Sequence, residues 1–237
     1  MTFTLDRVVP WGRDLEEYRR MFALEERETA SRILGCADGP ASFNAELTAV
    51  GGRVISVDPL YRFGIDAIRR RVVETSKTIL AETQRNRHEF VWSYFEDIAA
   101  LERTRLGAMG RFLEDFPLGL KTGRYRVAEL PQVPFADDSF DLALSSHFLF
   151  LYSEQLGLEF HLASLREMLR LAVEVRVFPL LQLGSQPSAL VGPVLEALRG
   201  DGHAATIEPV DYEFQRGGSR MLRVRRAAVG IRRAAVD

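Results

Sequence analysis

The chain has 237 residues, of which 46% are hydrophobic, and this length suits one large domain with a sizeable core. Its formal net charge is −2 at pH 7, which gives no electrostatic basis for binding nucleic acid or an anionic membrane surface. Cys36 is the only cysteine and excludes an internal disulfide, no apolar run reaches the ~20 residues of a membrane helix, and residues 1–18 lack a signal-peptide layout, so we expect a cytoplasmic protein.

The first predicted elements form a helix and then a β-turn-α-β unit. An amphipathic helix begins near Leu15, where Asp14 and Glu17 have the spacing of a capping box. A short strand at 32–34 breaks into the turn Gly35-Cys36-Ala37-Asp38-Gly39, and Pro40 is placed to open a helix over 41–50. A second strand, RVISVD, ends at Asp58. This order predicts two parallel strands joined by a right-handed crossover.

The later elements alternate between strands and helices. Apolar strands are predicted at 125–129, 140–145 and 173–181, with helices at 153–171 and about 187–198. The last two strands, 204–210 and 221–224, have no helix between them and predict a hairpin. We therefore expect an α/β fold with a doubly wound, mostly parallel sheet and one antiparallel strand near the C-terminus.

The interval between Asp58 and Glu129 is too long for a simple crossover. We interpret residues 64–119 as a crossover helix plus an inserted helical cap; the rival interpretation is a long loop. The aromatic run at 90–95 suits the core, and in a cap it would also roof a substrate pocket. The whole chain, 1–237, is interpreted as a single domain, with 227–237 as a flexible tail.

The turn between the first strand and its helix is the clearest chemical signal. A glycine turn lets a ligand approach the backbone, and the acidic residue that ends the next strand is placed to accept hydrogen bonds from ribose hydroxyls. Asp58 follows Gly39 by nineteen positions, which matches a nucleotide-type fingerprint. Alone, the same pattern also occurs where glycines only permit close packing.

Three segments in order make the pattern more specific. ILGCADGPASF, VISVDPLY and AELPQVPFADDSFDLALSSHFLFLY resemble the motifs of the class I S-adenosylmethionine-dependent methyltransferases. The resemblance covers roughly residues 32–58 and 124–224, and it implies a Rossmann-like fold with S-adenosylmethionine as cofactor. Two positions depart from the family pattern: Ile33 stands where an acidic residue is frequent, and Ala37 replaces the middle glycine.

The resemblance implies a cofactor site drawn from the turn and from the strand ends. Asp58 would bind the ribose and Glu129 would lie near the adenine amino group. Asp38 either replaces part of the missing acidic function or, as we prefer from sequence, caps the next helix. The implied cofactor-binding residues are Gly35, Cys36, Ala37, Gly39, Asp58, Pro59, Leu60, Glu129, Leu130, Ser145 and Ser146.

His147 is the candidate catalytic residue, because it follows the fourth strand of the resemblance and could act as a general base. The alternative is a structural hydrogen bond at a strand end. The first helix, with Arg13, Tyr18 and Phe22, is expected to form another wall of the pocket. No histidine pair has metal-ligand spacing, so no metal is expected.

The sequence therefore predicts methyl transfer from S-adenosylmethionine to a small-molecule acceptor, without nucleic acid or membrane as partner. The alternative is a non-catalytic module that only binds the cofactor, and a nicotinamide-dependent oxidoreductase is a third candidate. The identity of the acceptor, the atom methylated and the oligomeric state stay open.

Overall fold

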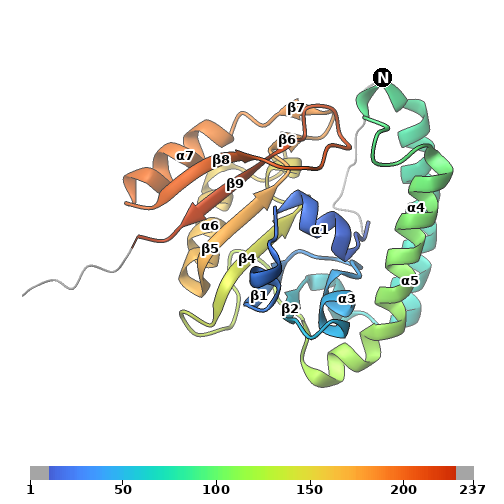
Figure 1. Cartoon of the computed structure of the whole chain (residues 1–237), viewed down its shortest axis with the longest axis horizontal. Helices are drawn as coiled ribbons and strands as arrows, with labels where there is room; N and C mark the ends of the chain where they lie inside the picture. Colours follow the sequence, from blue (N-terminus) through green and yellow to red (C-terminus); the bar gives the residue numbers. More distant parts are fainter. Residues whose placement is uncertain (1–10, 228–237) are drawn as a thin grey trace, which may run out of the picture.

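The computed structural model describes residues 11–227, which form one seven-stranded sheet with helices on both faces (Figure 1). The strands of this sheet are β1 (Arg32–Cys36), β2 (Arg53–Val57), β3 (Tyr125–Arg126), β4 (Phe140–Ser146), β5 (Ala172–Phe178), β8 (Ala204–Pro209) and β9 (Arg220–Arg225). Their order is β3-β2-β1-β4-β5-β9-β8, and β9 runs antiparallel to both of its neighbours. The predicted doubly wound, Rossmann-like sheet with one antiparallel strand is confirmed.

Helices cover the two faces of the sheet unequally. The α-helices are α1 (Leu15–Met21), α2 (Glu26–Thr29), α3 (Phe43–Ala49), α4 (Ile65–Arg85), α5 (Ile98–Thr122), α6 (Leu158–Leu171) and α7 (Val191–Gly200). Short 3-10 helices are η1 (Pro59–Arg62), η2 (Arg87–Glu89) and η3 (Phe150–Tyr152), and β6 (Leu181–Gln182) pairs with β7 (Gln186–Pro187). One face carries α1, α3 and α5, and the other carries α6 and α7.

The alternation of side chains along β1 separates the two cores. Ile33 packs with the residues of α1 and α3, whereas Leu34 and Cys36 pack with those of α6 and α7. Gly35 is two residues from Ile33, so it lies on the same face as α1 and α3. Side chains at positions 33 and 35 therefore point to the opposite face of the sheet from those at positions 34 and 36.

Several predicted boundaries differ from those observed. The capping box of α1 is confirmed, with the Glu17 N–H donating to Asp14 at 2.9 Å. Helix α3, however, begins at Phe43, so the prediction that Pro40 opens it is wrong. The Ser42 N–H instead donates to the Arg13 carbonyl at 3.0 Å, because the chain before α1 lies against this turn.

The third predicted strand is shorter than expected. β3 ends at Arg126, which pairs with Val57, the last residue of β2. Without a partner strand beyond that point, residues 127–129 leave the sheet. β5 likewise ends at Phe178, before Pro179, which has no N–H to donate to a strand ladder.

The segment between β2 and β3 contains two long helices that lie side by side (Figure 1). α5 packs on α3 and β3, and α4 packs on α5. Arg105 of α5 is fully buried and forms an ion pair with Glu17 of α1. This half of the predicted cap is therefore part of the core.

The aromatic run at 90–95 is also in the core. Phe90 and Phe95 are buried and contact Phe214, with ring centroids 4.8 and 5.1 Å away respectively. No residue of the run lines the cavity described below, so its expected second role as a pocket roof is wrong.

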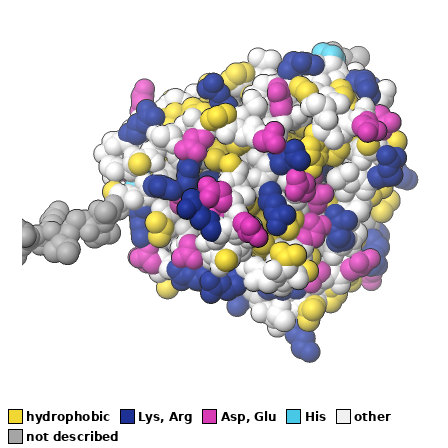
Figure 2. Space-filling view, in the orientation of Figure 1, with side chains coloured by type: hydrophobic (Ala, Val, Ile, Leu, Met, Phe, Trp, Pro, Cys, Tyr) yellow, Lys and Arg dark blue, Asp and Glu magenta, His cyan; other side chains and the backbone are white. Residues whose placement is uncertain are grey.

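The molecular surface mixes both signs of charge. On the face drawn in Figure 2, Lys and Arg alternate with Asp and Glu, and neither forms a broad patch of its own. No helix of residues 11–227 combines the length and apolar character needed to cross a bilayer. Residues 228–237 of the predicted tail lie outside the described part of the chain.

Candidate functional site

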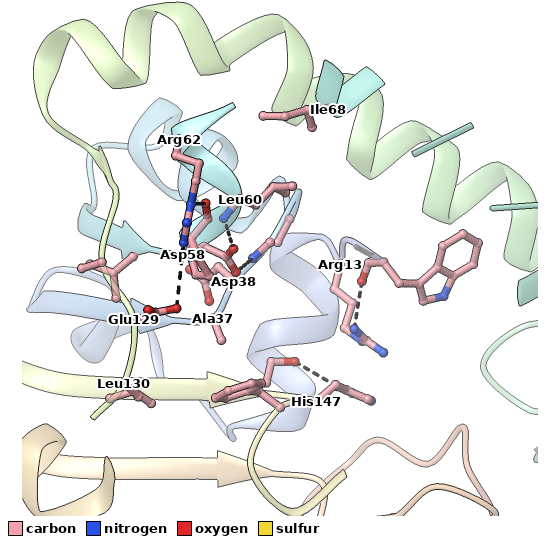
Figure 3. A pocket seen from close by; sticks show the side chains of 18 of the residues that line it. Arg13, Ala37, Asp38, Asp58, Leu60, Arg62, Ile68, Glu129, Leu130 and His147 are labelled. Atoms are coloured by element: carbon pink, nitrogen blue, oxygen red, sulfur yellow. Dashed lines mark hydrogen bonds and ion pairs between the residues drawn. The ribbon is translucent and has the colours of Figure 1, made fainter. Parts of the chain in front are cut away.

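A cavity of about 940 Å³ opens at the carboxyl ends of β1, β2 and β4 (Figure 3). Ligand crevices in doubly wound sheets lie at this edge, where the connections leave on opposite faces. The sequence-predicted residues that line the cavity are Ala37, Gly39, Asp58, Pro59, Leu60, Glu129, Leu130, Ser146 and His147.

Three of the residues implied by the resemblance do not reach the cavity. Cys36 and Ser145 are completely buried neighbours on β1 and β4, and burial raises the pKa of the Cys36 thiol well above its ordinary value. Gly35 lies beneath the Asp38 carboxylate, which a Cβ at position 35 would overlap. The glycine thus makes room for a side chain of this protein rather than for a ligand.

Asp58 is the anchor of the site. One carboxylate oxygen accepts the Gly39 N–H at 2.8 Å and the other accepts the Leu60 N–H at 2.7 Å. Burial raises the pKa of Asp58 to about 6, against the lowering effect of these two hydrogen bonds. Each oxygen keeps a further lone pair, so a half-buried carboxylate faces the cavity with fixed orientation.

The turn above β1 has an unusual backbone. Ala37 and Gly39 both have positive φ, of 59° and 55°, and the Ala37 N–H donates to the Val57 carbonyl at 2.9 Å. A non-glycine residue is strained in this region, and alanine adds the smallest possible side chain. The altered glycine position therefore retains a tight turn against the end of β2.

Asp38 does not cap α3, and that prediction is wrong. Its side chain turns back into the protein, where one oxygen accepts the Tyr18 hydroxyl at 2.8 Å and the other accepts the Ser56 hydroxyl at 2.6 Å. Burial raises the pKa of Asp38 to about 6. α1 and β2 together fix this carboxylate at the edge of the cavity.

The far end of the cavity is more exposed. Glu129 follows β3, and its carboxylate lies 4.0 Å from the Arg62 guanidinium (Figure 3). Both side chains are about half exposed or more, at 69% and 52%, so this ion pair adds little stability. Glu129 and Leu130 lie on the same side of the cavity as Asp58 (Figure 3).

His147 lies at the end of β4 in a left-handed conformation, with φ 52°. Its N–H donates to the Phe178 carbonyl at 2.6 Å, and its Nδ1 lies 2.9 Å from the Ser146 hydroxyl. Burial, together with the charges of Arg13 and Arg105, lowers the pKa of His147 well below its ordinary value. The imidazole is therefore neutral at pH 7, and the same burial and charges disfavour its protonated form.

The chain before α1 and helix α4 supply the remaining walls. Arg13 and Tyr18 line the cavity as expected, whereas Phe22 is buried in the core. Helix α4 belongs to the segment 64–119 that the sequence predicts as a helical cap, and it lines the cavity through Ile68 and Arg71. Further lining residues missed from sequence are Trp11, Ala41, Val57, Arg62, Phe63, Ala67, Ile68, Arg71, Ala128, Phe148, Leu156 and Phe160.

Arg13 is half-buried and has few hydrogen-bond partners. Its Nη1 donates to the Trp11 carbonyl at 3.0 Å, and within residues 11–227 its Nε has no hydrogen-bond partner. No carboxylate of that range lies within ion-pair distance of it. Figure 3 shows the Arg13 and His147 side chains pointing toward one another, away from Glu129.

Residues 11–227 hold no cluster of three His, Cys, Asp or Glu side chains that would suit a metal ion.

Comparison with known proteins gives one clear relative. No protein-family profile matches the sequence. The chain is 33% identical over 217 residues to the uncharacterized protein MJ0045 of Methanocaldococcus jannaschii, covering 91% of this chain and 95% of that protein.

Solved structures of similar fold share little sequence. PH0226 of Pyrococcus horikoshii has 10% identity and a TM-score of 0.47, covering 85% of this chain and 84% of that one. Magnesium protoporphyrin IX methyltransferase of Synechocystis, solved with bound S-adenosylmethionine, has 13% identity and a TM-score of 0.42, covering 84% and 71%. A SAM-dependent methyltransferase of Aquifex aeolicus has 14% identity and a TM-score of 0.42, covering 88% and 90%.

Proposed function

We propose that this chain, which belongs to the same family as the uncharacterized M. jannaschii protein MJ0045, binds S-adenosylmethionine in the cavity and methylates a small molecule. The observation that carries the proposal is Asp58, a carboxylate fixed by two backbone N–H groups at the end of β2. That position suits a pair of ribose hydroxyls, with Leu60 and Glu129 on the adenine side.

The size and lining of the cavity support a second, smaller ligand. Its volume of about 940 Å³ is at the upper end of the range for small-molecule sites. Beyond the turn, the wall is formed by apolar side chains from α4 and from the chain after β4, including Ile68, Phe148 and Phe160. We place the acceptor there, with α4 as the cover of the site.

The chemistry asks little of the protein. When bound, S-adenosylmethionine supplies an electrophilic methyl group whose carbon–sulfur bond breaks as the new bond to the acceptor forms. The protein must align the acceptor and exclude water. The neutral His147 imidazole can take the proton that a hydroxyl or amine acceptor loses.

The first test is the affinity for S-adenosylhomocysteine, measured by calorimetry. Asp58→Ala removes charge-assisted hydrogen bonds worth roughly 1.5–3 kcal/mol each, so the affinity should fall about tenfold or more. Asp211→Ala is the matched control, because Asp211 is 93% exposed on the surface. Unchanged affinity in folded Asp58→Ala protein would refute the assignment.

A second measurement separates the enzyme from a module that only binds the cofactor. The purified protein is incubated with methyl-labelled S-adenosylmethionine and fractions of a metabolite extract, and labelled products are identified by mass spectrometry. A labelled small molecule supports the enzyme. Binding without transfer to any fraction favours the module, and retention of a nicotinamide cofactor instead would exclude both.

A further inference from the structure

We propose that Arg13 and Asp38 form a subsite for a zwitterionic amino acid group, with the carboxylate on Arg13 and the ammonium on Asp38. The inference rests on the proposed function, since the group is the amino acid end of the cofactor. It also provides an acid in place of the one that the resemblance leads one to expect at position 33, where this chain has isoleucine.

Arg13 is placed to receive an anion. Its guanidinium lines the cavity, and its Nε is buried without a partner among the described residues. A buried donor without an acceptor is costly, and a ligand carboxylate would satisfy it with the fork geometry that arginine favours. The backbone around Arg13 is also fixed, because its carbonyl accepts the Ser42 N–H at 3.0 Å.

The protein carboxylate whose charge acts on Arg13 already has other partners. Glu17 is completely buried, and it forms an ion pair with Arg105 and accepts the Tyr212 hydroxyl at 2.7 Å. Its backbone N–H and side chain also complete the α1 capping box. Arg13 therefore keeps its charge available for the cavity.

Asp38 occupies the face of β1 where the missing acid would lie. Side chains at positions 33 and 35 point to the same face of the strand. Position 35 is glycine, and the Asp38 carboxylate fills the space where its side chain would begin. The acid is thus supplied from the turn, three residues after Gly35, instead of from the strand.

Tyr18 holds the Asp38 half of the subsite in place. Its hydroxyl donates to Asp38 at 2.8 Å, and its ring stacks on Phe43 with centroids 4.1 Å apart. Burial and the Asp38 charge raise the pKa of Tyr18 well above its ordinary value, and the Arg13 charge opposes this rise. Tyr18 thus fixes the Asp38 carboxylate, and Arg13, Tyr18 and Asp38 all line the same cavity.

The experiment compares ligands that keep all, part or none of the amino acid group. S-adenosylhomocysteine carries it, 5′-methylthioadenosine lacks it, and decarboxylated S-adenosylmethionine retains the amine without the carboxylate. Calorimetry on Arg13→Met should show S-adenosylhomocysteine binding about tenfold weaker or more, with the other two ligands changed less than about twofold. Asp38→Asn should weaken both amine-bearing ligands and spare 5′-methylthioadenosine.

Arg69→Met is the control, because Arg69 is an exposed arginine of α4 that is not among the residues lining the cavity. It should leave all three affinities unchanged. If Arg13→Met does not fold, Arg13→Lys keeps the charge but loses the fork, and it should give the same pattern of ligands with a smaller loss.

The outcomes distinguish the two proposals. If the parent protein binds neither S-adenosylhomocysteine nor 5′-methylthioadenosine, the proposed function itself is overturned. If it binds S-adenosylhomocysteine but Arg13→Met changes no affinity, or weakens all three ligands equally, only the amino acid subsite is overturned.

Discussion

At the scale of single residues, Asp38 makes the ligand-free protein less stable at neutral pH. Its pKa rises from 3.8 to about 6 in the folded protein because the side chain is buried. The folded state then binds a proton more tightly than the unfolded state. Stability therefore falls as the pH rises from about 4 to about 6, and the full loss persists above that range.

Asp38→Asn should remove this loss. Asparagine keeps a side chain of similar shape, and the variant should be more stable than the parent by about 1–3 kcal/mol at pH 8. The gain should vanish near pH 4. Denaturant unfolding at both pH values measures it, and a variant that is less stable than the parent at pH 8 would contradict the argument.

His147 is tested by separating turnover from binding. If it is the general base, His147→Asn should lower the methylation rate by roughly 10²–10⁴ and change the affinity for S-adenosylhomocysteine by less than about twofold. Because burial and the neighbouring arginines lower the pKa of His147, the rate of the parent at saturating cofactor should decline only at pH values well below ~6.5, the range of a free imidazole. Equal losses of rate and affinity would mean that His147 is structural.

At the scale of elements, the ion pair between Glu17 and Arg105 ties α1 to α5. Both side chains are completely buried, so removal of one partner leaves an uncompensated charge in the core. Arg105→Met should lower the free energy of unfolding by about 3–5 kcal/mol, and the double variant with Glu17→Gln should recover part of that loss.

Arg111→Met is the control for this pair. Arg111 also belongs to α5 and pairs with Glu46, but its side chain is 47% exposed. The loss of such a pair should change stability by about 1 kcal/mol or less. Equal effects at Arg105 and Arg111 would show that the buried pair does not stabilise the α1–α5 contact.

The contact between α1 and α5 means that deletion of residues 64–119 would disturb the core. α4 reaches the cavity through Ile68 and Arg71, but α5 contributes Arg105 to the core. Deletion of the whole segment would expose Glu17 together with the faces of α3 and β3. Substitutions on α4 are therefore the appropriate test of a cover over the acceptor.

At the scale of the whole molecule, cofactor binding should raise the melting temperature. A ligand present at about 100 times its Kd adds roughly 2.7 kcal/mol to the stability of the folded state. For a chain of this size, each kcal/mol corresponds to about 2–4 °C. S-adenosylhomocysteine should therefore raise the melting temperature by about 5–10 °C, whereas NADH at the same concentration should leave it unchanged. A rise with NADH alone would favour the oxidoreductase.

The sequence alone determined the order of the elements, the terminal hairpin and the place of Asp58. These features depend on local signals, since apolar periodicity marks strands and helices and glycine turns mark the points where they end. Parallel strands joined by helices bring their carboxyl ends to one edge. The turn after β1, the end of β2 and the residues after β4 were therefore predictable as neighbours.

Which of those residues face the cavity depends on how the chain packs in three dimensions. Cys36 and Ser145 belong to the predicted motifs, but the alternation of their strands directs them into the core. Asp38 looked like a local cap, yet its carboxylate is bound by Tyr18 and Ser56, which are distant in the sequence. Arg13 became prominent because the described residues around it leave its charge unpaired. Sequence patterns report local geometry, whereas the pairing and burial of a charge depend on contacts between distant segments, which form only when the chain folds.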